Sequence, residues 1–190
     1  SVLNVRVKEC APFENVYTLA LRGLHDKAMN ASNDMGDRRD MLQEALMTQR
    51  QMLIDAIGKP GEEIPQAFTP YKEVLDVYDE GLKLPDDVTI IWPDDNYGYM
   101  KRLSSPKEQK RSGRSGVYYH ASYLGKPHDH LWMNTVSPTL MYEELRKAYD
   151  ATADRIWLLN AGDIKSCEFA VDYFLTMAFD IDSFNFERAA

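Results

Sequence analysis

The chain has 190 residues, enough for a domain with a real core, and its 44% hydrophobic and 27% charged residues are ordinary for a globular protein. Its formal net charge of -8 argues against nucleic acid and against an anionic membrane as the main partner, because both repel an acidic surface. No apolar run reaches the roughly 18 residues that a membrane span needs, and the N-terminal stretch has no apolar segment typical of a signal peptide.

A strand at residues 16–21 opens the predicted order of elements. Within residues 37–57, apolar side chains recur at the helical spacing of about 3.6 residues, and Gly58 then supplies a C-terminal stop. A second strand is expected at residues 66–70, and a shorter helical pattern follows it at residues 71–82. The first part of the chain therefore alternates between strand and helix.

The same alternation continues further along the chain. The run VTIIW at residues 88–92 is almost continuously apolar, which is typical of a strand buried on both faces of a parallel sheet. A helical turn or two is expected at residues 107–111, and a fourth strand at residues 116–122. Ser137 is a predicted N-cap for a helix at residues 138–152, which begins with a proline.

A fifth strand at residues 155–160 and a final helix complete the order. The final helix places apolar side chains on one stripe: Cys167, Ala170, Val171, Phe174, Leu175 and Ala178. The βα unit thus repeats five times, which predicts a parallel sheet covered by helices. Two architectures fit: a doubly wound open sheet that five strands complete, and a (β/α)8 barrel of about 250 residues, of which five units are only a part. The repeating pattern does not choose between them.

Polar and aromatic side chains follow the C-terminal end of every predicted strand. In chain order these segments are RGLHD at 22–26, PYKE at 70–73, PDDNYGY at 93–99, YYHASY at 118–123 and NAGDIK at 160–165. The opposite strand ends look like plain turns. Because active sites of parallel α/β folds form at the C-terminal ends of the strands, we expect these segments to converge on one rim.

Carboxylates and aromatic rings dominate these segments and the loop after the fourth strand. The carboxylates are Asp26, Glu73, Asp94, Asp95, Asp129 and Asp163. In glycoside hydrolysis one carboxylic acid protonates the leaving oxygen, while another carboxylate activates water or attacks the sugar directly. Aromatic rings stack against the apolar face of a pyranose. The combination favours sugar chemistry.

The histidines permit a rival hypothesis, a metal-dependent barrel hydrolase. His120, His128 and His130 could ligate a metal together with Asp129 or Asp163. The His-Asp-His run follows Gly-Lys-Pro, so it is expected in a loop, which does not aim both rings inward as a strand would. The two cysteines, at positions 10 and 167, lie far apart and are expected to be free or buried thiols.

Several of these motifs resemble glycoside hydrolase family 115. The motifs are WPDDNYGY at 92–99, RSG at 111–113, GVYYHASY at 116–123, PYKEV at 70–74, GKPHD at 125–129 and RGLHD at 22–26. The resemblance runs from about Val7 to Phe179. It implies a xylan α-1,2-glucuronidase, which removes glucuronic or 4-O-methylglucuronic acid from internal and terminal xylose units with inversion of configuration.

The resemblance also implies an architecture. The family's catalytic domain resembles a (β/α)8 barrel, so we expect an α/β fold that forms a partial TIM-type barrel of about five βα units with parallel strands. Residues 1–190 would then be a single domain, the C-terminal part of the catalytic barrel, without the rest of the barrel and without flanking domains. The function expected of it is hydrolysis, and the alternative is a catalytically incomplete carbohydrate-binding fragment.

Site residues follow from the resemblance, position by position. Glu73 resembles the leading catalytic carboxylate, Asp26 a second essential acid, and Asp94 a further carboxylate of the same pocket. The implied substrate-binding residues are Arg22, Tyr71, Asn96, Tyr118, His120 and Tyr123. Arg22 suits the carboxylate of a uronic acid as a charge-assisted, bidentate partner.

The roles of acid and base stay open at this stage. An inverting pair of carboxyl groups stands roughly 6.5–9.5 Å apart. Glu73 is expected to begin a helix, whose dipole favours the ionised form and hence the role of base, although burial acts in the opposite sense. Two positions depart from the family pattern, Leu124 where an aromatic residue is expected and Lys126 where arginine is common, and both bear on substrate preference.

The expected partners are glucuronoxylan or glucurono-xylooligosaccharides, and no cofactor or metal ion is expected. Nucleic acid and membranes are not expected as partners. For the full-length enzyme the resemblance implies a periplasmic or secreted location and leaves a homodimer open.

Overall fold

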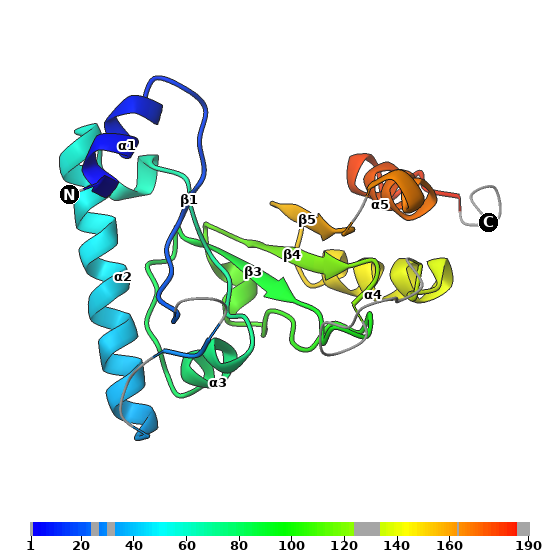
Figure 1. Ribbon diagram of the computed structural model, residues 1–190, viewed down its shortest axis with the longest axis horizontal. Coiled ribbons are helices and arrows are strands. Elements are labelled where there is room, and N and C mark those ends of the chain that lie inside the picture. The colour runs from blue at the N-terminus through cyan, green and yellow to red at the C-terminus, as the bar shows by residue number, and fades with distance from the viewer. Residues whose placement is uncertain (1, 24–26, 30–32, 124–133, 163, 186–190) are drawn as a thin grey trace. The chain divides into compact units, whose positions relative to one another are not determined.

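The computed structural model describes residues 2–23, 27–29, 33–123, 134–162 and 164–185 (Figure 1). The chain packs as two compact units. Unit 1 comprises Ser1–Ile90 and Arg111–Gly113, and unit 2 comprises Ile91–Lys110 and Arg114–Ala190. The predicted site residues divide between them, with Arg22, Tyr71 and Glu73 in unit 1 and the others that the structure describes in unit 2.

Strands and helices alternate along the chain. The helices are α1 (Val2–Cys10), α2 (Met35–Ile57), α3 (Glu73–Asp79), α4 (Pro138–Asp150) and α5 (Glu168–Phe179). The strands are β1 (Tyr17–Thr18), β2 (Gln66–Phe68), β3 (Thr89–Pro93), β4 (Ser115–His120) and β5 (Trp157–Asn160). Short 3-10 turns occur at η2 (Gly61–Glu63), η3 (Glu108–Lys110) and η4 (Ile164–Ser166).

The strands form one sheet in the order β1-β2-β3-β4-β5, the order of the chain. Pairing is parallel between β1 and β2, between β2 and β3, and between β4 and β5. A doubly wound sheet reverses its strand order at a switch point, whereas a barrel adds each βα unit beside the previous one. The order observed here does not reverse, which confirms the expected α/β fold with parallel strands of a partial TIM-type barrel.

The long helix α2 has strong signals at both ends. The side chain of Asp34 accepts a hydrogen bond from the backbone N–H of Asp37, which caps the first turn. At the other end Gly58 adopts a left-handed conformation, and its N–H donates to Ile54, as the sequence predicts. The buried face of α2 consists of Leu42, Leu46 and Leu53. In Figure 1, α1 lies beside this helix, and the two are in contact.

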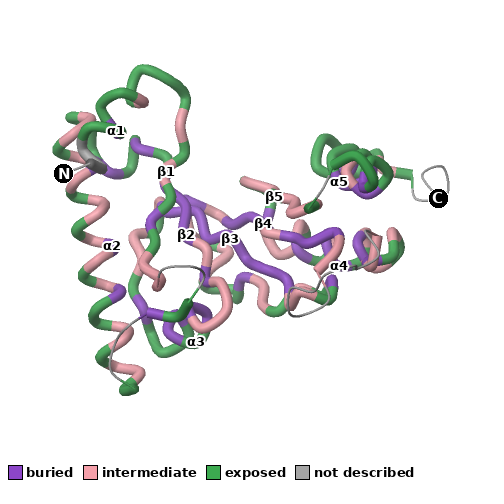
Figure 2. The backbone as a smooth tube through the Cα atoms, in the orientation of Figure 1, coloured by how far each residue is buried: buried purple, intermediate pink, exposed green. Residues whose placement is uncertain are grey.

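Unit 2 is built around α4, α5 and the strands β4 and β5. Ser137 caps α4 by accepting from the N–H of Leu140, and Pro138 lies in the first turn, as predicted. The core of this unit contains Val117, Tyr119, Ala121, Val136, Met141, Leu145, Ala148, Ala153, Ala170, Tyr173, Phe174, Met177 and Ile181. Figure 2 shows β4 as largely buried, whereas β5 is of intermediate or full exposure.

Some element boundaries differ from the expectations. The strand expected at residues 16–21 is reduced to Tyr17–Thr18, because Val16 is exposed and only Leu19 continues the hydrogen bonding to β2 beyond it. Helix α3 begins at Glu73 and not at residue 71, because Lys72 has a positive φ of 52°. Helix α1 was not predicted, since only Val7 of its described side chains is buried and no apolar stripe marks it.

Candidate active site

In unit 1, the guanidinium of Arg22 forms a bidentate ion pair with the carboxylate of Glu73. Nε of Arg22 donates to Oε1 at 3.1 Å, and Nη2 donates to Oε2 at 3.1 Å. Both side chains keep about a fifth of their surface exposed, at 21% and 22%. Arg22 follows β1 and Glu73 follows β2, so this ion pair lies beyond the C-terminal ends of two paired parallel strands. Such bidentate pairs fix the geometry of a carboxylate as well as its charge.

The turn between β2 and α3 is sharp at Lys72. Its backbone has φ 52° and ψ -122°, a conformation that residues with a Cβ atom rarely adopt. The next residue, Glu73, is the first residue of α3, so the strained turn presents its carboxylate at the start of a helix. Strain of this kind persists only where the surrounding structure enforces it, and it gathers at functional sites.

Tyr71 completes the group in unit 1. The guanidinium carbon of Arg22 lies 5.5 Å from the centroid of its ring, and Nζ of Lys72 lies 5.1 Å from it. These distances are within the range of cation–π attraction. The group therefore combines one carboxylate, two cations and one aromatic ring, which suits an acidic sugar.

In unit 2, Asp94 and His120 form a buried pair. Asp94 is 3% exposed and His120 is 1% exposed. Oδ1 of Asp94 lies 2.7 Å from Nδ1 of His120, while Oδ2 accepts the backbone N–H of the same histidine at 3.0 Å. Asp94 comes directly after β3, and His120 is the last residue of β4. The carboxylate thus holds both the ring and the backbone of His120.

Tyrosine rings flank His120 within the same unit. The ring centroids of Tyr118 and Tyr123 each lie 4.7 Å from that of His120, with interplanar angles of 55° and 41°. The hydroxyl of Tyr118 accepts a hydrogen bond of 3.0 Å from the side-chain amide of Asn160, the last residue of β5. The histidine ring therefore contacts two tyrosine rings in addition to its hydrogen bond at Nδ1.

The loop after β3 is fixed by hydrogen bonds to its own backbone. Oδ1 of Asp95 accepts from the N–H groups of Tyr97 and Tyr99, at 2.8 Å and 3.1 Å. Asn96, whose backbone is left-handed with φ 67°, donates its N–H to Oδ1 of Asp94 at 3.2 Å. Asparagine tolerates this conformation better than most residues.

The same loop is anchored to β4 by Tyr119. Its hydroxyl donates a hydrogen bond of 2.7 Å to the carbonyl of Gly98, and its ring is fully buried. Burial raises the pKa of the Tyr119 hydroxyl well above its ordinary value, with a further contribution from Asp94. The phenol is therefore a permanent donor at neutral pH, and it holds Gly98 in place.

Comparison with known proteins assigns the chain to a family. The model of glycosyl hydrolase family 115 matches residues 1–190. The chain belongs to glycoside hydrolase family 115. A solved structure of the family superposes with a TM-score of 0.88 at 45% sequence identity, and it is described as a novel family GH115 4-O-methyl-alpha-glucuronidase with specificity for decorated arabinogalactans. The match covers 94% of this chain but only 24% of the solved chain, and no curated protein matches.

The predicted site residues of this family 115 chain fall into two groups. Unit 1 brings together Arg22, Tyr71 and Glu73, and unit 2 brings together Asp94, Asn96, Tyr118, His120 and Tyr123. Asp26 lies outside the described residues, and so do Leu124, Lys126, His128, Asp129, His130 and Asp163. Each candidate residue that the structure describes therefore contacts at least one other candidate.

Two further residues of the predicted rim segments take part in the geometry, although the sequence analysis did not name them as site residues. Lys72 supplies the turn conformation that precedes Glu73, and Asn160 holds the hydroxyl of Tyr118. Asn160 carried a usable signal, because it is a polar residue at the end of an apolar strand. The backbone conformation of Lys72 could not be predicted, since a lysine in the sequence gives no indication of a positive φ.

Within the described residues, no group of three or more His, Cys, Asp or Glu side chains is arranged to hold a metal ion. The histidines and aspartates of the metal hypothesis beyond His120 lie outside that part of the chain. Neither Cys10 nor Cys167 forms a disulfide, and Cys167 is buried. None of the described helices is long and apolar enough to cross a bilayer.

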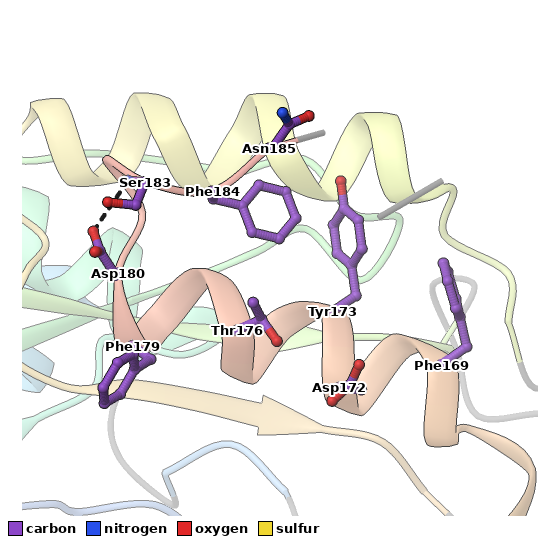
Figure 3. A pocket seen from close by; sticks show the side chains of 9 residues that line it. All are labelled: Phe169, Asp172, Tyr173, Thr176, Phe179, Asp180, Ser183, Phe184 and Asn185. Atoms are coloured by element: carbon purple, nitrogen blue, oxygen red, sulfur yellow. Dashed lines mark hydrogen bonds between the residues drawn. The ribbon is translucent and has the colours of Figure 1, made fainter. Parts of the chain in front are cut away.

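A cavity of about 590 Å³ lies beside α5 (Figure 3). Its lining residues are Phe169, Asp172, Tyr173, Thr176, Phe179, Asp180, Ser183, Phe184 and Asn185. Hydrogen bonds from Ser183 hold the pKa of Asp180 below its ordinary value. None of the predicted site residues lines this cavity. We place the candidate site at the C-terminal strand ends, because the Arg22–Glu73 and Asp94–His120 pairs lie there.

Proposed function

We propose that this chain supplies part of the catalytic face of a glycosidase that removes α-1,2-linked glucuronic or 4-O-methylglucuronic acid side chains from glucuronoxylan. The observation that carries the proposal is the bidentate pair of Arg22 and Glu73 at the ends of β1 and β2. A carboxylate is needed for glycoside hydrolysis, and an arginine fork suits a uronic acid. Membership of family 115 supports the same reaction class.

In the proposed mechanism two carboxyl groups act on opposite sides of the sugar. One donates a proton to the leaving xylose oxygen, and the other removes a proton from the attacking water, which inverts the configuration. Glu73 is our candidate for one of these roles, and Asp26 is our candidate for the other. Tyr71 and Arg22 would bind the uronic acid, through the ring face and the carboxylate respectively.

Arg22 has a second consequence for the mechanism. Its fork is already engaged by Glu73, so a uronate that binds Arg22 competes with Glu73 for the same donors. Substrate binding would then weaken the hold on Glu73 just as the sugar arrives. A carboxylate released from a bidentate partner is free to accept a proton, and the carboxylic acid that this forms can donate one.

A second function is compatible with the length of the chain. The chain spans about a quarter, 24%, of the solved relative, so parts of a complete site can lie on polypeptide that it does not contain. A catalytically incomplete fragment that binds acidic oligosaccharides would keep the Arg22 and Tyr71 contacts without turnover. Binding without release of sugar would identify this second function.

The test measures release of 4-O-methylglucuronic acid by the longest native polypeptide that contains this chain. Glucuronoxylan and a decorated arabinogalactan are compared, since the solved relative is described as specific for the latter polymer. Glu73→Ala should lower the turnover rate by about 10²–10⁴-fold, the usual contribution of a general acid or base. Glu80→Gln is the matched control, because Glu80 is exposed at the other end of α3.

The outcomes separate reaction from substrate. Loss of release on both polymers in Glu73→Ala, with Glu80→Gln unaffected, supports the role of Glu73. Release from arabinogalactan alone would overturn xylan as the substrate while keeping the enzyme class. Unchanged release by Glu73→Ala would exclude Glu73 from the reaction.

A further inference from the structure

The surroundings of Asp94 differ from those of a carboxylate that meets a substrate. Its side chain has no exposed surface, at 0%. Both of its oxygens are occupied by protein donors, namely the backbone N–H groups of Asn96 and His120 and the ring Nδ1 of His120. A general base must reach water, and a general acid must reach the leaving oxygen. The described structure gives Asp94 neither path.

The hydrogen bond from His120 to Asp94 determines where the ring carries its proton. An ionised carboxylate only accepts hydrogen bonds, so the 2.7 Å contact requires a proton on Nδ1 of His120. When the ring is neutral, Nε2 is then the acceptor nitrogen. A carboxylate that accepts a hydrogen bond from Nδ1 of a histidine in this way fixes the tautomer of the ring, and with it whether Nε2 accepts or donates a hydrogen bond.

The positions of Tyr118 and Tyr123 depend on the orientation of the His120 ring, because both tyrosine rings contact it. Tyr118 and Tyr123 each approach the histidine ring to 4.7 Å between centroids. Asn160 in turn holds the hydroxyl of Tyr118. A change in the rotamer of His120 would therefore displace two tyrosine rings that the family resemblance implies bind the substrate.

We infer that Asp94 is a positioning residue that acts on the site chiefly through His120, by fixing the Nδ1–H form and the orientation of that ring beside Tyr118 and Tyr123. The inference rests on the proposed function for the identity of the reaction, but not for the geometry. It also narrows the search for the acid and the base, because Asp94 supplies neither. Glu73 and Asp26 remain as the carboxyl groups for those roles.

The first test reads the protonation of the His120 ring directly. The longest native polypeptide that contains this chain is labelled with ¹⁵N-histidine, and the resonances of His120 are identified by their absence in His120→Asn. We expect a proton on Nδ1 in the native protein and its loss or redistribution in Asp94→Asn. Asp95→Asn is the matched control, because Asp95 neighbours Asp94 and its carboxylate accepts from the N–H groups of Tyr97 and Tyr99 in its own loop. It should leave the His120 resonances unchanged.

The second test is a double-mutant cycle on kcat/KM with Asp94→Asn and His120→Asn. Loss of an outer partner of a functional histidine typically lowers activity about 10–100-fold. If Asp94 acts chiefly through His120, the double variant should be no less active than His120→Asn alone, within about two-fold. Independent roles would instead multiply the two losses.

Each outcome decides one of the two claims. A bare Nδ1 in the native protein, or multiplied losses in the cycle, would overturn the inference about Asp94. Absence of any glucuronic acid release by the native protein would count against the proposed function. In that case an Nδ1–H resonance that disappears in Asp94→Asn would still support the positioning role, and an unchanged resonance would overturn it.

Discussion

Lys72 holds a backbone conformation that glycine adopts more easily than any other residue. At φ 52° the Cβ atom of an L residue is crowded, at a cost of about 1–2 kcal/mol, whereas glycine loses about 0.5–1 kcal/mol through its larger unfolded-state entropy. Lys72→Gly should therefore be more stable than Lys72→Ala by about 1 kcal/mol in urea unfolding. Both variants remove the lysine side chain, so their difference isolates the backbone. An alanine variant as stable as the glycine variant would show that the turn is not strained.

Two buried tyrosines differ in whether their hydroxyl has a partner. Tyr119 donates to the carbonyl of Gly98, whereas the hydroxyl of Tyr173 has no hydrogen-bond partner among the described residues. Removing a hydroxyl that is buried and unpaired relieves a desolvation penalty, while removing a paired one leaves an acceptor unsatisfied. Tyr173→Phe should therefore raise the free energy of unfolding of this chain by about 1 kcal/mol, and Tyr119→Phe should lower it by about 1 kcal/mol. Opposite signs in chemical denaturation would contradict this account.

The alkaline side of the stability profile gives an independent check on Tyr173. Burial raises the pKa of Tyr173 from its model-compound value of 10.0 to about 12. Between these values the unfolded chain has lost the phenolic proton and the folded chain has kept it, so stability falls as pH rises from about 10 to about 12. Tyr173→Phe should flatten this fall in urea titrations at several pH values. A slope identical to that of the native chain would exclude Tyr173 as a contributor.

At the scale of single residues, some features of the candidate site could be predicted from the sequence and others could not. Glu73, Arg22 and His120 could be named from their position after apolar strands and from the family motifs. The burial of Asp94 could not, because its three hydrogen bonds come from backbone and ring atoms brought together by β3 and β4. A carboxylate in a motif looks the same in sequence whether it meets the sugar or the protein.

At the scale of elements, the loop after β3 depends on one glycine. Gly98 has φ 94°, and an added Cβ would lie 2.9 Å from Val136 Cγ1 and 3.1 Å from the hydroxyl of Tyr119. Gly81, with φ 100°, has no atom within 4 Å of the same position. Gly81→Ala should therefore destabilise by backbone strain alone, about 1–2 kcal/mol. Gly98→Ala should lose a further 1–3 kcal/mol, roughly, through overpacking.

Unfolding of the two glycine variants in urea measures this difference. Equal losses would mean that the loop yields to the new methyl group and is not clamped by Tyr119. A larger loss for Gly98→Ala would show that the conformation of residues 94–100 is set by its packing as well as by its asparagine and glycine.

Helices with local signals were predicted well, and those without them were missed. The proline start and serine cap of α4 and the glycine stop of α2 are encoded within a few residues of each helix end. Helix α1 lacks such signals and is held by contact with α2, which a local pattern cannot reveal. Strand ends agreed with the structure or were displaced by up to three residues, since pairing partners decide where a strand stops.

For the whole chain, the alternation of strands and helices predicted the class but not the architecture. Both an open sheet and a barrel satisfy a βα repeat, and their difference lies in which strand follows which across the sheet. The observed order β1-β2-β3-β4-β5 answers that question, and hydrophobic periodicity contains no information about it. The family motifs did contain it, because they are tied to one architecture.

Strand β5 ends this order and leaves one of its edges without a described partner strand. Leu158 on this strand is 44% exposed, and β3 by comparison is buried along its whole length. An exposed edge strand with apolar side chains is a template for pairing with another chain. We therefore expect the 190-residue chain to self-associate with rising concentration, measured by light scattering or sedimentation.

Leu158→Lys should reduce this association, because a lysine on an edge strand opposes pairing with a second edge. Val5→Lys adds the same charge at an exposed position of α1, far in sequence from β5. If the two variants reduce association equally, the cause is net charge and not the edge. If only Leu158→Lys reduces association, the exposed edge of β5 is the surface through which the chain associates.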